Sequence, residues 1–288
     1  MLSLSILYRG PLASCNYGCA YCSLAKDSTA ASHAGDEASL ARFVAWAAGR
    51  GDDRIAVFFT PAGEVLTHGR YQRAIARLTE LPGIVKVAVQ TNLSCSLEWM
   101  RSCHTEKLAL WCTYHPRHVQ RESFLEQCRT LDALGVRYSV GMVGLREHLG
   151  EAEQIRGILP PRVYLWINAY RHVARYYSPE LAERFTAIDP LFPFNLCPHA
   201  SHNEACHTGH KVIAVDGDGT IRRCHFVAES LGNLYQSGWD QALRPRPCPR
   251  AECHCHIGYV HLAHLQLDEI FQEGLLERIP TYVSTMGR

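Results

Sequence analysis

The sequence predicts an α/β fold, in which six strand–helix units form a partial (β/α)6, TIM-like barrel and a small cysteine-rich domain follows. From residue 2 to about residue 168, short apolar segments alternate with amphipathic ones. The apolar segments are typical of buried parallel strands. The amphipathic segments carry apolar residues three or four positions apart, as helices with one buried face do. Beyond residue 168 the alternation stops, and six cysteines lie between Cys197 and Cys255.

Each predicted element follows from this alternation. The expected strands are residues 2–8, 54–59, 85–90, 108–114, 137–142 and 163–167, and the expected helices include residues 37–50, 70–81 and 119–134. Residues 1–170 would form the barrel domain, residues 171–196 a bridging segment and residues 197–288 the cysteine-rich domain. Within that last domain we expect a hairpin at residues 212–223, with its turn at 216–219, and a final amphipathic helix over residues 261–277.

Composition and charge exclude several classes of protein. Hydrophobic residues make up 47% of the chain and charged residues 20%, as in soluble globular proteins. There is no apolar run long enough for a membrane span and no secretion signal. The net charge of +1, from 29 basic and 28 acidic residues, gives no electrostatic footprint for nucleic acid. We therefore expect a cytoplasmic protein without membrane or nucleic-acid partners, whose 13 cysteines serve metal or redox chemistry.

Three cysteines near the N-terminus are the strongest indication of function. Cys15, Cys19 and Cys22 follow the first predicted strand with the spacing C-x3-C-x2-C, Tyr21 directly precedes the last of them, and no further cysteine occurs before Cys95. An iron–sulfur cube normally takes four thiolates, so three leave one iron open to an exogenous ligand. The alternative is a zinc site with His33 as a fourth ligand.

This loop resembles the signature of the radical S-adenosylmethionine enzymes. The resemblance implies that the three cysteines bind a [4Fe–4S] cluster, whose open iron is chelated by the amino and carboxylate groups of S-adenosylmethionine. It also implies reductive cleavage of that cofactor to a 5′-deoxyadenosyl radical, with an electron donor such as flavodoxin or ferredoxin. Residues 7–12 resemble a bacterial subgroup of the family. Because the first strand ends at residue 8, no N-terminal leader-peptide-binding domain is expected.

Two further segments match motifs of that family at the ends of predicted strands. Ala62, Gly63 and Glu64 stand where the family has a Gly-Gly-Glu-Pro motif that contacts the amino group of the methionine moiety, and a carboxylate with backbone carbonyls suits an ammonium group. A surface turn is the alternative interpretation. Thr91 and Asn92 stand where the family has Thr-Asn-Gly, near the ribose or the substrate.

The resemblance also assigns two residues to the adenine side of the cofactor. Gly141 belongs to a segment similar to the family's glycine-rich motif, although it is one residue shorter. Ile167 lies on the sixth predicted strand, where the family holds the adenine ring with an apolar residue. Core packing is an equally good interpretation of Ile167, because apolar residues on strands are usually buried.

His115 and Cys112 are candidates for chemistry on the substrate. Alternation along the fourth strand places Trp111, Thr113 and His115 on one face and Leu110, Cys112 and Tyr114 on the other, and does not say which face points inward. His115 ends the strand, where such barrels place active-site residues, and could act as an acid or base or simply bond the next loop. Cys112 could donate a hydrogen atom if it faced the pocket, and packing is the alternative.

The second group of cysteines resembles the start of SPASM and twitch auxiliary-cluster domains. Cys206 is followed by twelve residues, Gly219, four residues and Cys224. The resemblance implies a second [4Fe–4S] cluster, bound by Cys206, Cys224 and two of Cys248, Cys253 and Cys255. Cys197 would be a spare residue or a ligand of another, incomplete site. A structural zinc site that uses His254 or His256 is the alternative.

Together these features predict a radical S-adenosylmethionine enzyme that abstracts a hydrogen atom from a peptide or a small natural-product precursor. The auxiliary cluster would accept an electron or anchor the substrate. Analogy of fold cannot choose between the two substrate classes. A zinc-binding interaction module and an RNA-modifying radical enzyme remain as alternatives.

Overall fold

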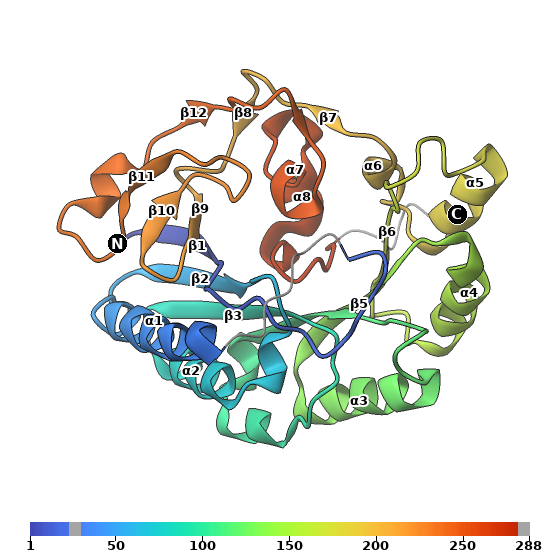
Figure 1. Ribbon diagram of the computed structural model, residues 1–288, viewed down its shortest axis with the longest axis horizontal. Helices are drawn as coiled ribbons and strands as arrows, with labels where there is room; N and C mark the ends of the chain where they lie inside the picture. Colours follow the sequence, from blue (N-terminus) through green and yellow to red (C-terminus); the bar gives the residue numbers. More distant parts are fainter. Residues whose placement is uncertain (23–29, 282–288) are drawn as a thin grey trace.

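A large, mostly parallel sheet organises the chain (Figure 1). The computed structural model describes residues 1–22 and 30–281. Its sheet has nine strands in the order β11-β10-β9-β1-β2-β3-β4-β5-β6. The first six pair in parallel and span β1 Ser3–Tyr8, β2 Arg54–Phe59, β3 Ile84–Thr91, β4 Leu108–Thr113, β5 Arg137–Val143 and β6 Leu165–Asn168. All six predicted strands are thus present, whereas closure into a partial barrel stays a prediction.

Helices cover one face of this sheet. They are α1 Ala30–Ala48, α2 Gly69–Glu80, α3 Arg121–Leu134 and α4 Leu149–Ile158, and in Figure 1 they follow its outer side. The main core lies between the two layers, where Ile6, Phe59 and Leu110 of the strands meet Phe43 and Phe124 of the helices. Two further helices, α5 Pro179–Ile188 and α6 Pro193–Leu196, lie in the bridging segment. None of the described helices is long and apolar enough to cross a membrane.

The cysteine-rich segment continues the same sheet. Strand β9 Val212–Val215 pairs in parallel with β1, and β10 Thr220–Arg222 returns antiparallel to it before β11 Ser230–Asn233. This confirms the predicted hairpin, whose turn uses Gly219 at a φ of 88°, a conformation that glycine adopts without steric cost. Two small antiparallel sheets join β7 His199–Ala200 to β13 Glu252–Cys253 and β8 Ala205–Cys206 to β12 Arg246–Pro247. The predicted domain boundaries remain predictions.

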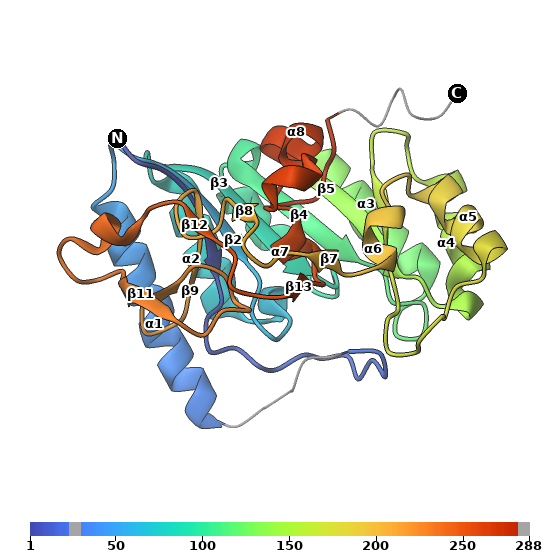
Figure 2. The same ribbon diagram turned by 90° about the horizontal axis from the view of Figure 1, so that it is seen from above.

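The prediction of a single helix over residues 261–277 is wrong. The segment forms α8 Leu267–Phe271 and short 3-10 turns at Ala263–Leu265 and Gln272–Gly274, and it follows the short helix α7 His256–Tyr259. Gln266 and Gln272 have φ values of 50° and 46°, and such left-handed residues interrupt a right-handed helix. The apolar residues of this segment instead pack on the second face of the sheet, against Leu7, Phe58 and Trp111. Figures 1 and 2 show α7 and α8 on the side of the sheet opposite α1 to α3.

A buried ion pair fixes the end of this C-terminal segment to the sheet. The Glu277 carboxylate is fully buried and accepts hydrogen bonds from Lys86 Nζ of β3 at 2.7 and 2.9 Å. Arg137 lies 3.4 Å from the same carboxylate, and Ser139 Oγ donates to the Glu277 carbonyl at 2.6 Å. Removing one partner of a buried pair leaves an uncompensated charge, which costs more than the pair contributes.

We expect Glu277→Gln to lower the free energy of unfolding by about 3 kcal/mol, because the buried Lys86 ammonium then lacks its carboxylate. Glu80→Gln is the matched control, since Glu80 forms an exposed pair with Arg77 and should cost less than about 1 kcal/mol. Urea unfolding followed by circular dichroism measures both. Equal losses in the two variants would contradict this account.

Candidate functional site

Most of the predicted site residues meet at one cavity of about 260 Å³. It lies at the carboxyl ends of the parallel strands, where barrel enzymes place their active sites. Its wall combines the cysteine loop after β1, the ends of β2 to β6 and the start of α7. The predicted residues that line it are Cys15, Cys19, Tyr21, Cys22, Ala62, Gly63, Glu64, Thr91, Asn92, His115 and Cys255. Segments far apart in the sequence therefore form one site.

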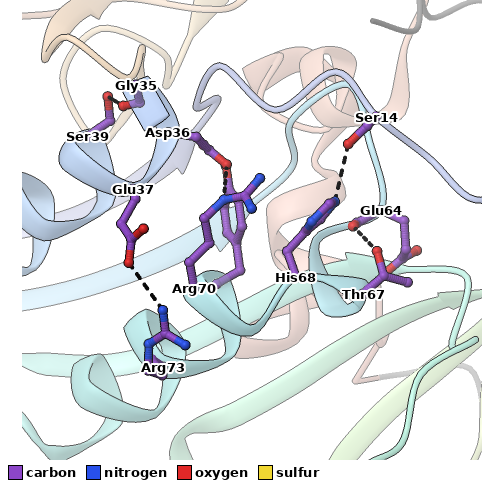
Figure 3. Close-up of polar contacts among 11 residues, drawn as sticks. Ser14, Gly35, Asp36, Glu37, Ser39, Glu64, Thr67, His68, Arg70 and Arg73 are labelled. Carbon is purple, nitrogen blue, oxygen red and sulfur yellow. Dashed lines mark hydrogen bonds and ion pairs between the residues drawn. The ribbon is translucent and has the colours of Figure 1, made fainter. Parts of the chain in front are cut away.

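The cysteine loop is held closely against the turn that follows β2 (Figure 3). The backbone N–H of Glu64 donates to the Ser14 carbonyl at 2.9 Å, and Ser14 Oγ lies 3.2 Å from His68 Nε2. A Cβ atom at Gly63 would lie only 2.1 Å from the Ser14 carbonyl oxygen. Glycine is therefore required at position 63, because any side chain would push the cysteine loop away.

The carboxylate of Glu64 is buried and organises the floor of the cavity. Oε1 accepts hydrogen bonds from Leu66 N at 3.0 Å and Thr91 Oγ1 at 2.7 Å, and Oε2 accepts one from Asn92 N at 2.5 Å. Burial raises the pKa of Glu64 to about 7, although these three hydrogen bonds oppose the rise. The turn is not a surface turn, so that alternative is wrong. Glu64 instead fixes Thr91 and Asn92 at the end of β3.

Helix α1 is attached to α2 by a buried carboxylate, that of Asp36. The Asp36 carboxylate is fully buried, and it accepts hydrogen bonds from Arg70 Nε at 2.7 Å and from the Tyr71 hydroxyl at 2.5 Å. Both partners belong to α2, as Figure 3 shows for Arg70. Helix α2 begins directly after His68, which contacts the cysteine loop. The two helices and the loop are thereby linked through one short segment.

Strand β4 points its Trp111, Thr113 and His115 face into the cavity, which the sequence left open. His115 Nδ1 lies 2.7 Å from the Tyr21 hydroxyl and 3.5 Å from Cys19 Sγ. The rings of His115 and Tyr21 are parallel, with centroids 5.9 Å apart. His115 therefore supports the cysteine loop from the opposite wall, and its role as an acid or base stays a prediction.

Three of the predicted catalytic and cofactor-binding residues do not line the cavity. Cys112 and Ile167 are fully buried in the core on the helix side of the sheet, because they alternate with inward-facing neighbours. Packing is the interpretation that fits both residues. At Gly141, a Cβ atom would lie 2.0 Å from the indole of Trp166, so this glycine makes room for a ring that lines the cavity. The cofactor contacts expected of Gly141 and Ile167 and the hydrogen donation expected of Cys112 are thus not supported by their positions.

The second group of cysteines also comes together. Cys224 and Cys253 are buried, and each lies within electrostatic range of Cys206, Cys248 and Cys255. Strand pairing explains the approach, because Cys206 faces Arg246 across β8 and β12, two residues before Cys248. Cys197 is exposed at the end of α6. Cys255, His256 and Ile257 also line the first cavity, a link that no sequence motif indicates.

The donor chemistry of both groups suits iron–sulfur clusters. In residues 1–22 and 30–281, no three His, Cys, Asp or Glu side chains are arranged as ligands of a single metal ion. A cube takes one thiolate on each iron, so its thiolates need not converge on one point. In the first group, three thiols share a cavity with a buried carboxylate and the polar ends of β3. The side chain of His33, the fourth ligand in the zinc alternative, lies outside the described residues.

Comparison with solved structures shows that the fold is shared with known enzymes. The chain matches histidine-tagged anSMEcpe with bound AdoMet at a TM-score of 0.55, with 14% identity over 84% of this chain and 79% of that one. It matches native anSMEcpe with bound AdoMet and Cp18Cys peptide at 0.54, with 13% identity over 83% and 82%. No protein-family profile and no curated protein matches the sequence. At these identities the likeness concerns the fold alone.

We expect Gly63→Ala to lower the iron bound after anaerobic reconstitution by about four atoms per chain, one cube, because the added methyl group displaces Ser14 and the cysteine loop. Gly150→Ala is the control, since a Cβ atom there would meet nothing within 4 Å. Iron analysis per chain measures both. Full iron content in Gly63→Ala would show that the close approach does not matter.

The raised pKa of Glu64 predicts a pH dependence of stability. A carboxyl whose pKa rises on folding stabilises the protein while protonated, and this contribution disappears as the pH rises from about 4.5 through about 7. Relative to Glu64→Gln, the wild type should lose about 2 to 3 kcal/mol between about pH 5 and about pH 8. Urea unfolding at both pH values measures this difference. A constant difference would mean that the Glu64 pKa is not raised.

Proposed function

We propose that the protein is a radical S-adenosylmethionine enzyme. The observation that carries the proposal is the shared cavity, where the thiols of Cys15, Cys19 and Cys22 face the buried Gly63–Glu64 turn and the Thr91–Asn92 end of β3. These segments come from three different strands. They follow one another along the chain in the order of the family's motifs. The fold likeness to anSMEcpe, whose structures contain AdoMet, supports the same conclusion.

The residues of the cavity have distinct roles in this proposal. Cys15, Cys19 and Cys22 would hold a [4Fe–4S] cluster, which together with S-adenosylmethionine supplies a 5′-deoxyadenosyl radical for hydrogen abstraction. The carboxylate of Glu64, with Thr91 and Asn92 fixed by it, offers acceptors for an ammonium group. The aromatic walls formed by Trp111 and Trp166 keep water away from reactive species.

The substrate and the second cluster form the finer part of the proposal. We infer that the substrate is a peptide or a small natural-product precursor, and native anSMEcpe with bound peptide supports the peptide class. A second [4Fe–4S] cluster in the Cys206–Cys255 region would aid oxidation or anchor the substrate. This region reaches the first cavity through Cys255. A one-electron carrier such as flavodoxin or ferredoxin would supply electrons in the cytoplasm.

We expect anaerobically reconstituted protein to bind about eight irons per chain, from two cubes, and to release 5′-deoxyadenosine from S-adenosylmethionine with dithionite. Cys19→Ala should abolish this release, because the first cluster loses one of its three thiolates. Cys103→Ala is the matched control, since Cys103 packs against the core away from the cavity. Chromatographic quantification of 5′-deoxyadenosine measures both. Release by Cys19→Ala at the wild-type rate would refute the proposed function.

A further inference from the structure

The second group of cysteines holds one thiol more than a four-iron cube requires. Five cysteines gather there, and Cys253 lies within electrostatic range of the other four. A cube accepts four thiolates, one on each iron. If a single auxiliary cluster forms, one cysteine of the five is therefore not a ligand. The sequence spacing does not distinguish which one it is.

Cys255 differs from the other four in what it faces. It lines the same cavity as Cys15, Cys19 and Cys22, whereas Cys206, Cys224, Cys248 and Cys253 are not part of the described wall. It is the N-cap residue of α7, so its position is set by the packing of this helix against the second face of the sheet. Cys253, only two residues earlier, belongs to β13, where it pairs with His199 of β7. Its Sγ lies against Gly258, where a Cβ atom would be only 2.7 Å away. The two thiols therefore belong to different surroundings.

The charges near Cys255 also set it apart. Burial raises the pKa of the Cys255 thiol, and the Ile257 backbone N–H together with the guanidinium groups of Arg171, Arg278 and Arg9 partly offsets that rise. Arg9 directly follows strand β1 and donates to the Thr60 carbonyl, and Arg171 donates to the His254 carbonyl. Arg278 lies behind the cavity wall, 4.7 Å from the ring centroid of Trp166 and 5.4 Å from that of Trp111. The three guanidinium groups favour the thiolate form of Cys255, but none of them lines the cavity.

An unpartnered polar atom beside Cys255 points to a ligand in the cavity. His256 is 4% exposed and lines the cavity, and its Nε2 has no hydrogen-bond partner among the described residues. Within the same described part of the chain, Nη1 of Arg171 and both Nε and Nη1 of Arg278 are also buried without a partner. Buried polar groups are normally hydrogen-bonded. Of these three residues, His256 lines the cavity, so its unpartnered Nε2 indicates that the cavity binds a group beside Cys255.

We propose that Cys206, Cys224, Cys248 and Cys253 form the complete ligand set of the auxiliary cluster, and that Cys255 is a free thiol in the wall of the reaction cavity. This inference rests on the proposed function and deepens it. The four ligands saturate all four irons, so the auxiliary cluster has no open coordination site. The thiol of Cys255 then lets the cysteine-rich region contact a ligand bound in the cavity.

Two neighbouring cysteines allow a matched test on the full-length holoenzyme. Cys255→Ser should keep about eight irons per chain after anaerobic reconstitution, whereas Cys253→Ser should keep about four, because it removes one ligand of one cube. Iron analysis per chain gives both values. A loss of about four irons in Cys255→Ser would overturn the assignment.

Alkylation of the wild-type holoenzyme gives a second measurement that needs no variant to fold. Iodoacetamide followed by peptide mass spectrometry should label Cys255, while the four ligands stay protected until the iron is removed. Adding S-adenosylmethionine should slow the labelling at least several-fold, because it would occupy the same cavity. Protection of Cys255 together with labelling of Cys253 or Cys248 would overturn the inference.

The same data separate the inference from the function on which it rests. If the wild type holds only about four irons and releases 5′-deoxyadenosine, the proposed function stands, but the auxiliary ligand set is wrong. If the wild type holds no iron and releases none, both are wrong. If it holds about eight irons and Cys255→Ser loses four, only the choice of ligands is wrong.

Discussion

Parallel pairing of β1 to β6 is the constraint on which the site depends. In such a sheet every strand ends at the same edge, so the segments that follow them are brought together. The register is continuous across the site: Tyr8 pairs with Phe59, Thr91 with Cys112, and Val143 with Asn168. The cysteine loop, the Gly63–Glu64 turn and the end of β3 are therefore neighbours, although up to about 80 residues separate them in the chain. Helices on one face and the C-terminal segment on the other keep this edge in place.

Close backbone contact and a buried carboxylate then fix these neighbouring segments in one arrangement. Gly63 allows the Ser14 carbonyl to approach, and the Glu64 carboxylate binds the backbone and hydroxyl groups of Leu66, Thr91 and Asn92. A buried carboxylate without such partners would be costly. The hydrogen bonds therefore explain how an acidic side chain can lie in the floor of a partly apolar cavity. They also make the first cavity sensitive to changes at a single turn.

The C-terminal segment closes the structure from the side opposite the helices. Its apolar residues fill the inner face of the sheet, and Glu277 anchors it through Lys86. The segment places Cys255 and His256 in the wall of the first cavity, and it places Cys253 near Cys206, Cys224 and Cys248. One short stretch thus connects the two candidate cluster sites. The cysteine-rich region is also joined to the main sheet directly, because β9 pairs with β1.

The sequence by itself predicted the six parallel strands, the hairpin of β9 and β10, and the motif residues after β1, β2 and β3 that line the first cavity, because these depend on local periodicity and on motifs at strand ends. It could not determine which face of β4 points inward, so Cys112 remained a candidate until packing placed it on the helix side. It also predicted one helix over residues 261–277, since apolar spacing does not reveal that Gln266 and Gln272 turn the chain. Only the tertiary structure decided that Cys255 shares a cavity with Cys15, Cys19 and Cys22. That contact spans more than 230 residues and follows from packing across the sheet, which no local pattern encodes.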